Sequence, residues 1–204
     1  MGGKEGDGEI NKKMETKRLK IILASASPRR KELLAGLDLD FKVKVIKGVS
    51  ESYLESLRAE EVPQYISREK AAAYQVADDE LLLTADTVVV VDNTILGKPH
   101  DADDARRMLR LISGRTHQVV TGVTLTTAKA QKTFGVTTDV TFRQLTDDEI
   151  NYYISQYRPF DKAGAYGIQE WIGYIGVTSI HGSYYNVMGL PVQHIYQEIM
   201  KMEK

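Results

Sequence analysis

The chain has no cysteine among its 204 residues, and several other common features are also missing. Without cysteine, disulfide bonds, thiolate nucleophiles and cysteine-ligated zinc are excluded. The composition fits the reducing cytoplasm, where we expect the protein. No apolar run approaches the roughly 18 residues of a membrane span, and the N-terminus lacks the hydrophobic region of a signal peptide. We therefore expect neither a membrane partner nor export.

An excess of positive charge is missing as well. The formal net charge is −1, so the chain lacks the broad positive field of a protein that binds nucleic acid without sequence preference. The four histidines are dispersed and show no metal-ligand spacing. The P-loop and the dinucleotide fingerprint are absent too. We expect no nucleic acid partner, and a small anion would have to be met by local clusters of cations.

The domain organisation is simple. Residues 1–18 are glycine-rich, charged and nearly devoid of large apolar groups, which predicts a disordered extension. No internal repeat and no linker rich in proline, glycine or serine follows. Residues 19–204 are therefore predicted to form a single two-lobed domain.

Apolar periodicity predicts strands and helices in mixed order. Strands are expected at residues 21–24, 37–45, 81–91, 94–96, 119–127, 134–142, 174–180 and 184–188. Helices are expected from Pro28, over residues 63–77, after Asp101, after Thr146 with Glu149 in a capping box, and after Pro191. Because the strands and helices do not alternate strictly, we expect an α/β fold with a mixed twisted sheet, flanking helices and a cleft.

A strand that passes directly into a helix is the most informative local pattern. Ser27 is a favoured N-cap and Pro28 a favoured first helical residue. The free N–H groups of such a helix start attract phosphate, and the guanidinium groups of Arg29 and Arg30 can bind phosphate oxygens in a bidentate way. Cations oppose the helix dipole there, which indicates that an anion normally lies nearby. The alternative is an exposed basic turn.

Asp86 is the second anomaly, because it interrupts the apolar central strand at residues 81–91. A buried carboxylate costs several kcal/mol without partners, so Asp86 must pair with a cation, bind a metal or act at the mouth of a cleft. Lys70, Lys98 and Glu51 are by themselves typical surface charges. If they converge with Asp86 and the two arginines, they form a set suited to a polyphosphate with Mg²⁺ or Mn²⁺.

Four spaced motifs give the chain a family resemblance. They are Ser25-Ala26-Ser27-Pro28-Arg29-Arg30, Ala85-Asp86-Thr87-Val88-Val89, Leu96-Gly97-Lys98-Pro99 and Ala163-Gly164-Ala165-Tyr166-Gly167-Ile168-Gln169. In this order they resemble the Maf family, and the match runs from about residue 21 to residue 199. The resemblance implies a fold related to inosine triphosphatases, in which two lobes enclose a nucleoside triphosphate. It also implies hydrolysis between the α- and β-phosphorus atoms, with a divalent metal, to give a monophosphate and pyrophosphate.

The resemblance also implies roles for individual residues. Asp86 matches the proton acceptor of the family, which would activate water, and with Glu51 it falls on the metal site. Further positions of the phosphate and metal site are matched by Ser25, Arg29, Arg30, Lys70 and Lys98. The combination of Arg29, Thr87 and Gln169 resembles the branch that acts on dTTP and UTP, rather than the branch that acts on methylated guanine nucleotides.

Physical chemistry makes this base preference plausible, because one glutamine amide can both donate to and accept from the imide edge that thymine and uracil share. Two alternatives remain open at this stage. One is a non-catalytic nucleotide-binding regulator of septum formation, a process with which the family is linked. The other is an enzyme of the same class that acts on modified nucleotides. The homodimer common among related proteins is a further open question.

Overall fold

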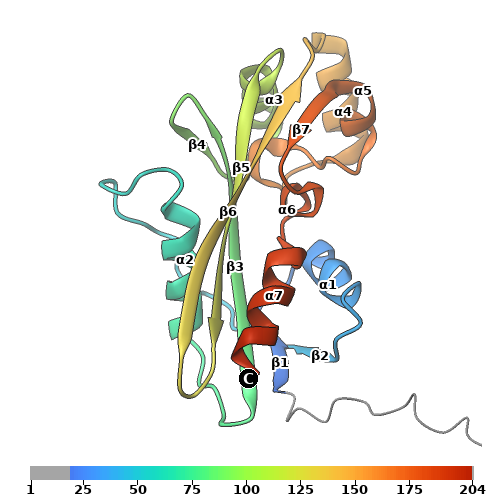
Figure 1. Ribbon diagram of the computed structural model, residues 1–204. Helices are drawn as coiled ribbons and strands as arrows, with labels where there is room; N and C mark the ends of the chain where they lie inside the picture. Colours follow the sequence, from blue (N-terminus) through green and yellow to red (C-terminus); the bar gives the residue numbers. More distant parts are fainter. Residues whose placement is uncertain (1–18, 204) are drawn as a thin grey trace, which may run out of the picture.

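The computed structural model describes residues 19–203, so the extension expected at residues 1–18 lies outside the described part. A twisted sheet with helices on both faces forms the molecule (Figure 1). The strands are β1 (Lys20–Leu23), β2 (Phe41–Val43), β3 (Glu80–Val91), β4 (Thr94–Leu96), β5 (Thr116–Thr126), β6 (Gln131–Phe142) and β7 (Val177–His181). The helices are α1 (Pro28–Ala35), α2 (Val62–Ala72), α3 (Ala102–Ile112), α4 (Asp147–Tyr157), the short 3₁₀ helix η1 (Ala163–Ala165), α5 (Trp171–Gly176), α6 (Tyr184–Met188) and α7 (Val192–Met202). None of the described helices is long and apolar enough to cross a membrane.

The sheet is mixed, as the sequence predicts. Its strand order is β2-β1-β3-β5-β6-β7, and β4 pairs with β3 outside this path. β1 runs parallel to β2 and β3, whereas the other pairs are antiparallel. β3 is central and apolar on both faces, which confirms the expectation for this strand.

One edge of β3 is open in its middle, between the parts that pair with β1 and β4. β1 pairs with β3 only as far as Leu83, and β4 joins the same edge only from Val89 onwards. The backbone of residues 84–88 therefore has no strand beside it on that edge. Asp86 lies in the centre of the gap.

The two faces of β3 pack against different helices. The odd-numbered side chains Leu81 and Leu83 contact a core with α1 and α7, and farther along Val89 and Val91 contact a core with α3 and α4. The even-numbered Leu82 packs against α2. Figure 1 shows α2 on one side of the sheet and α1 and α7 on the other. Because side chains alternate along a strand, the side chains of Asp86 and Thr87 point to opposite faces.

A glycine allows α2 to lie close to the sheet. Gly122 of β5 is the register partner of Asp86. A Cβ atom at Gly122 would lie 2.2 Å from the carbonyl carbon of Pro63, at the start of α2. Since no real side chain tolerates such a distance, only glycine permits this contact. The close approach brings α2, which carries Lys70, against the face that carries Asp86.

Several predicted boundaries are wrong. The strand predicted at residues 37–45 is only Phe41–Val43, because residues 37 and 38 still bond back to α1 in a turn. The helix predicted over residues 63–77 ends at Ala72. The strand predicted at residues 174–180 begins as α5 and becomes β7 only at Val177.

The strand predicted at residues 184–188 is a one-turn helix, α6. Its N-cap, Ser183, accepts a hydrogen bond from the backbone N–H of Asn186, and Gly189 ends it at a φ of 118°. A serine cap and a glycine stop are helix signals that outweigh the short apolar pattern between them.

Candidate active site

A cavity of about 780 Å³ lies at the open edge of β3. Its walls come from the loops after β1 and β4, from residues 161–169, and from the end of α6. All nine residues that the sequence singles out line it: Ser25, Arg29, Arg30, Glu51, Lys70, Asp86, Thr87, Lys98 and Gln169. Residues that lie up to 144 positions apart in the sequence are therefore brought to one place.

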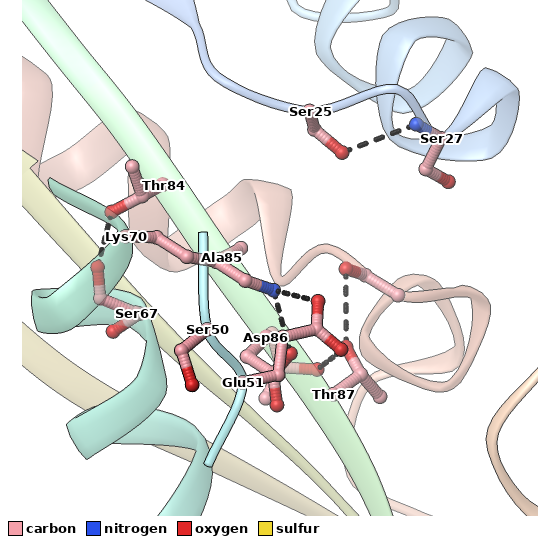
Figure 2. Close-up of polar contacts among 12 residues, drawn as sticks. Ser25, Ser27, Ser50, Glu51, Ser67, Lys70, Thr84, Ala85, Asp86 and Thr87 are labelled. Atoms are coloured by element: carbon pink, nitrogen blue, oxygen red, sulfur yellow. Dashed lines mark hydrogen bonds and ion pairs between the residues drawn. The ribbon is translucent and has the colours of Figure 1, made fainter. Parts of the chain in front are cut away.

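Lys70 lies between two carboxylates, and we call Glu51, Lys70 and Asp86 the open cluster. The Lys70 Nζ atom is 2.8 Å from Asp86 Oδ1 and 2.8 Å from Glu51 Oε1. Figure 2 shows the three side chains converging from α2, β3 and the loop before α2. The Lys70 and Asp86 side chains are 16% and 13% exposed, whereas Glu51 is 53% exposed and faces solvent. The positive charge of Lys70 thus compensates the negative charge of Asp86, which would be unfavourable in the apolar strand without a partner.

The surroundings of Glu51 keep its carboxylate charged. Burial alone would raise its pKa, but the hydrogen bond from Lys70 and the charges of Lys70, Lys98 and Arg30 hold the pKa below its usual value. Lys98 follows β4, is exposed, and makes no hydrogen bond or ion pair within residues 19–203. Its ammonium group is therefore available to an anion in the cavity.

The open cluster has the donor chemistry of a divalent-cation site. Within the described part of the chain, Asp86 Oδ2 and Glu51 Oε2 have no hydrogen-bond or ion-pair partner. Carboxylate oxygens are the ligands that Mg²⁺ and Mn²⁺ favour, and Mg²⁺ is commonly held by one or two carboxylates together with substrate phosphates. No group of three or more histidine, cysteine or acidic side chains suited to a metal occurs in residues 19–203. The residues present fit a metal shared with a ligand better than one held by protein alone.

Arg30 occupies the gap in the sheet rather than the open part of the cavity. It donates from Nη1 to Ala85 O at 2.9 Å, from Nη2 to Thr87 Oγ1 at 3.0 Å and from Nε to Gly189 O at 2.8 Å. Burial lowers the pKa of the guanidinium, and the charge of Asp86 opposes this shift. Since Ala85 and Thr87 flank Asp86, Arg30 fixes this part of β3 from the face opposite the Asp86 side chain. An anion would have to bind the guanidinium N–H groups of Arg30 that do not take part in these three bonds.

Arg29 and the two serines lie at the start of α1. Arg29 Nη1 is 3.0 Å from Asp161 Oδ2, in an ion pair between two residues of the cavity wall. Ser27 caps the helix by accepting from the N–H of Arg30, as the sequence predicts. Ser25 Oγ accepts from the N–H of Ser27 at 3.2 Å. The loop that would receive a phosphate is thus preorganised by its own side chains.

Thr87 and Gln169 occupy the remaining predicted positions. Thr87 Oγ1 lies 2.9 Å from Thr121 Oγ1, on the face opposite Asp86, as the regular strand register requires. The Gln169 Oε1 atom is buried and has no hydrogen-bond partner among residues 19–203. A buried amide oxygen without a partner is unusual, and in a cavity wall it points to a ligand donor.

Sequence reasoning missed a second lysine between two carboxylates, and we call Asp161, Lys162 and Glu170 the closed cluster. Lys162 Nζ is 2.9 Å from Asp161 Oδ1 and 3.0 Å from Glu170 Oε1. Asp161 and Lys162 line the cavity. A signal was available in the sequence, because Asp161 and Lys162 form a charged pair directly before the glycine-rich motif at residues 163–169.

The chain is similar to known proteins over nearly all of its described length. The family model described as "Maf-like protein" matches residues 20–202. A dTTP/UTP pyrophosphatase of Phocaeicola vulgatus is 60% identical over 90% of this chain and 96% of its own, and one of Bacteroides fragilis is 56% identical over 91% and 97%. The solved structure of a HAM1 protein from Coxiella burnetii aligns with a TM-score of 0.48 at 15% identity, covering 90% of this chain and 100% of that one. Because the family model and these relatives span nearly all of the described residues, the chain belongs to the Maf family.

Proposed function

We propose that this protein is a nucleoside triphosphate pyrophosphatase that hydrolyses dTTP and UTP to the monophosphate and pyrophosphate. The names of its close relatives support the class of reaction and the two substrates. The observation that carries the chemistry is the open cluster, in which Asp86 lines the cavity, is held by Lys70 through one oxygen, and has no partner for the other within residues 19–203.

The cluster suggests how the reaction proceeds. Asp86 Oδ2 accepts a proton from a water molecule, whose oxygen forms a bond to the α-phosphorus. The bond from that phosphorus to the bridging oxygen breaks, and pyrophosphate leaves with the electron pair. Lys70 holds Asp86 in place, while Lys98 and Arg29 offset the negative charge that develops on the leaving group. Arg30 keeps the backbone around Asp86 rigid.

A divalent cation completes the proposal. Glu51 and Asp86 would hold Mg²⁺ or Mn²⁺, which when bound would neutralise phosphate oxygens and help to orient the substrate. The proposed base function and metal binding both use Asp86, whose carboxylate has lone pairs beyond the one that Lys70 engages.

The proposal is tested by measuring pyrophosphate release from the four common dNTPs, UTP and CTP, and from methylated nucleotides, with Mg²⁺, with Mn²⁺ and with a chelator. We expect dTTP and UTP to exceed the other nucleotides in kcat/KM by about tenfold or more, and the chelator to abolish release. Faster turnover of a methylated nucleotide would move the substrate to the modified class. Tight binding of dTTP without release of pyrophosphate would favour the regulator instead.

A further inference from the structure

Lys162 is a nearly buried lysine in the wall of the cavity. It is the residue before η1, and its side chain is 10% exposed. An ammonium group there needs compensation, which Asp161 and Glu170 provide at 2.9 and 3.0 Å. These two bonds fix the position of Nζ.

The two carboxylates of the closed cluster are fully engaged. Asp161 Oδ2 accepts from Arg29, and Glu170 Oε2 accepts from the hydroxyl of Tyr153. That hydroxyl also accepts the backbone N–H of Gly167 at 3.0 Å. Each carboxylate oxygen of this cluster therefore has a partner, which leaves no free pair of oxygens for a cation. An ammonium has three N–H donors, and Asp161 and Glu170 use two of those of Lys162. The third is free within the described part of the chain.

Lys162 and Gln169 flank the same glycine. A Cβ atom at Gly167 would lie 2.9 Å from Lys162 Cε and 3.2 Å from Gln169 Nε2. Both side chains line the cavity, and Gln169 contributes the buried Oε1 atom that lacks a partner. One acceptor and several N–H donors are thus gathered at one part of the cavity wall.

We propose that Lys162 is a specificity-determining residue that, together with Gln169, reads the imide edge of uracil or thymine. This inference deepens the proposed function and rests on it for the substrate class. An imide edge presents two carbonyl acceptors on either side of an N–H donor. The Gln169 amide accepts from that N–H and donates to the carbonyl at C2, and Lys162 donates to the carbonyl at C4, which cytosine lacks.

The same pair disfavours cytosine. Cytosine has an amino donor in place of one imide carbonyl, and its ring nitrogen is an acceptor. The ammonium of Lys162 would face a donor, and Gln169 Oε1 would face an acceptor, so buried polar groups would be left unpaired. Lys162 is also a poor phosphate ligand, because its two carboxylates have no free oxygen to hold a metal that would offset their repulsion of a polyphosphate.

The test measures binding of UMP and CMP by calorimetry, because monophosphates require no hydrolysis. Wild-type protein is expected to prefer UMP. Lys162→Met, which keeps an unbranched side chain of similar length, is expected to weaken UMP binding by about 10- to 100-fold, as the loss of a charged hydrogen bond does. CMP binding should change little, so the preference collapses. An equal loss for both ligands, or an unchanged preference, would overturn the inference.

Two controls keep the result interpretable. Lys162→Met with Glu170→Gln removes one carboxylate that the single variant leaves unpaired, so the preference can be measured if the single variant folds poorly. Lys98→Met removes an exposed cation of the same cavity and is expected to leave the preference for UMP over CMP unchanged. If the UMP preference collapses in Lys162→Met but wild-type protein releases no pyrophosphate from UTP, the proposed function fails and the inference on Lys162 stands. If UTP is hydrolysed while Lys162→Met keeps the preference, the inference alone fails.

Discussion

Two clusters beside the cavity have the same composition, a lysine between two carboxylates, but differ in their bonding. In the open cluster, Asp86 and Glu51 each bind Lys70 through one oxygen, and the other oxygen has no partner within residues 19–203. In the closed cluster, the oxygens of Asp161 and Glu170 are all engaged by Lys162, Arg29 or Tyr153. A carboxylate with a free oxygen can accept a proton or a cation, whereas a saturated one fixes geometry. The bonding therefore suits the open cluster to chemistry and the closed cluster to positioning.

The largest effect should come from removing the free carboxylate of the open cluster. Asp86→Asn is expected to lower kcat for dTTP by about 10²- to 10⁴-fold, the usual contribution of a general base. The matched change in the closed cluster, Glu170→Gln, should cost far less kcat. Steady-state kinetics, with circular dichroism to verify folding, measures both. Near-normal turnover by Asp86→Asn would contradict the assigned base.

Lys70 tests the electrostatics of the open cluster. Its hydrogen bond and charge hold the pKa of Glu51 below the usual value. In Lys70→Met the pKa of Glu51 should rise, so Glu51 takes up a proton at a higher pH and activity is lost earlier as the pH falls. The acidic limb of the kcat/KM profile should therefore move to higher pH. Lys129→Met, in the turn between β5 and β6, should leave the profile unchanged, and an unshifted limb in Lys70→Met would argue against this linkage.

Tyr153 tests the closed cluster as a positioning device. Tyr153→Phe removes the hydroxyl that donates to Glu170 and accepts from Gly167, in a fully buried side chain. The free energy of unfolding should fall by about 1–3 kcal/mol, because two polar groups lose their partner. KM should rise more than kcat falls.

Urea denaturation and kinetics measure these two effects. The control is Tyr157→Phe, which alters an exposed ring that stacks on Tyr153. It should change stability by no more than about 0.5 kcal/mol. Equal effects of Tyr153→Phe and Tyr157→Phe would contradict the positioning role of the Tyr153 hydroxyl in the closed cluster.

The smallest effect concerns Lys98, the exposed cation near the open cluster. Lys98→Ala is expected to raise KM by up to about fivefold, in line with exposed charge pairs. The difference from wild type should shrink as salt is added, because exposed charges are screened. Measuring KM at low and high ionic strength checks this, with Lys129→Ala as the comparison. If the increase in KM were the same at low and high ionic strength, Lys98 would act through packing instead of through its charge.

Much of the fold could be predicted from patterns of residues close in sequence. The central strand, the Ser27 and Thr146 caps and the β5–β6 pair follow from apolar periodicity and from capping chemistry. The region after residue 170 was predicted less well. There, short apolar runs of helix and strand look alike, and the outcome depends on caps and on packing against β6.

The sequence by itself determined most of the elements and the anomaly of a carboxylate in an apolar strand, and its family resemblance implied that nine residues share one candidate site. Only the tertiary structure decided how those residues are bonded. Arg30 has the signature of a phosphate ligand in the sequence, yet in the fold its N–H groups bind Ala85 O, the Thr87 hydroxyl and Gly189 O. Lys70 and Lys162 cannot be told apart by residue type. What distinguishes them is which carboxylate oxygens remain unbonded, and that depends on contacts between segments far apart in the chain.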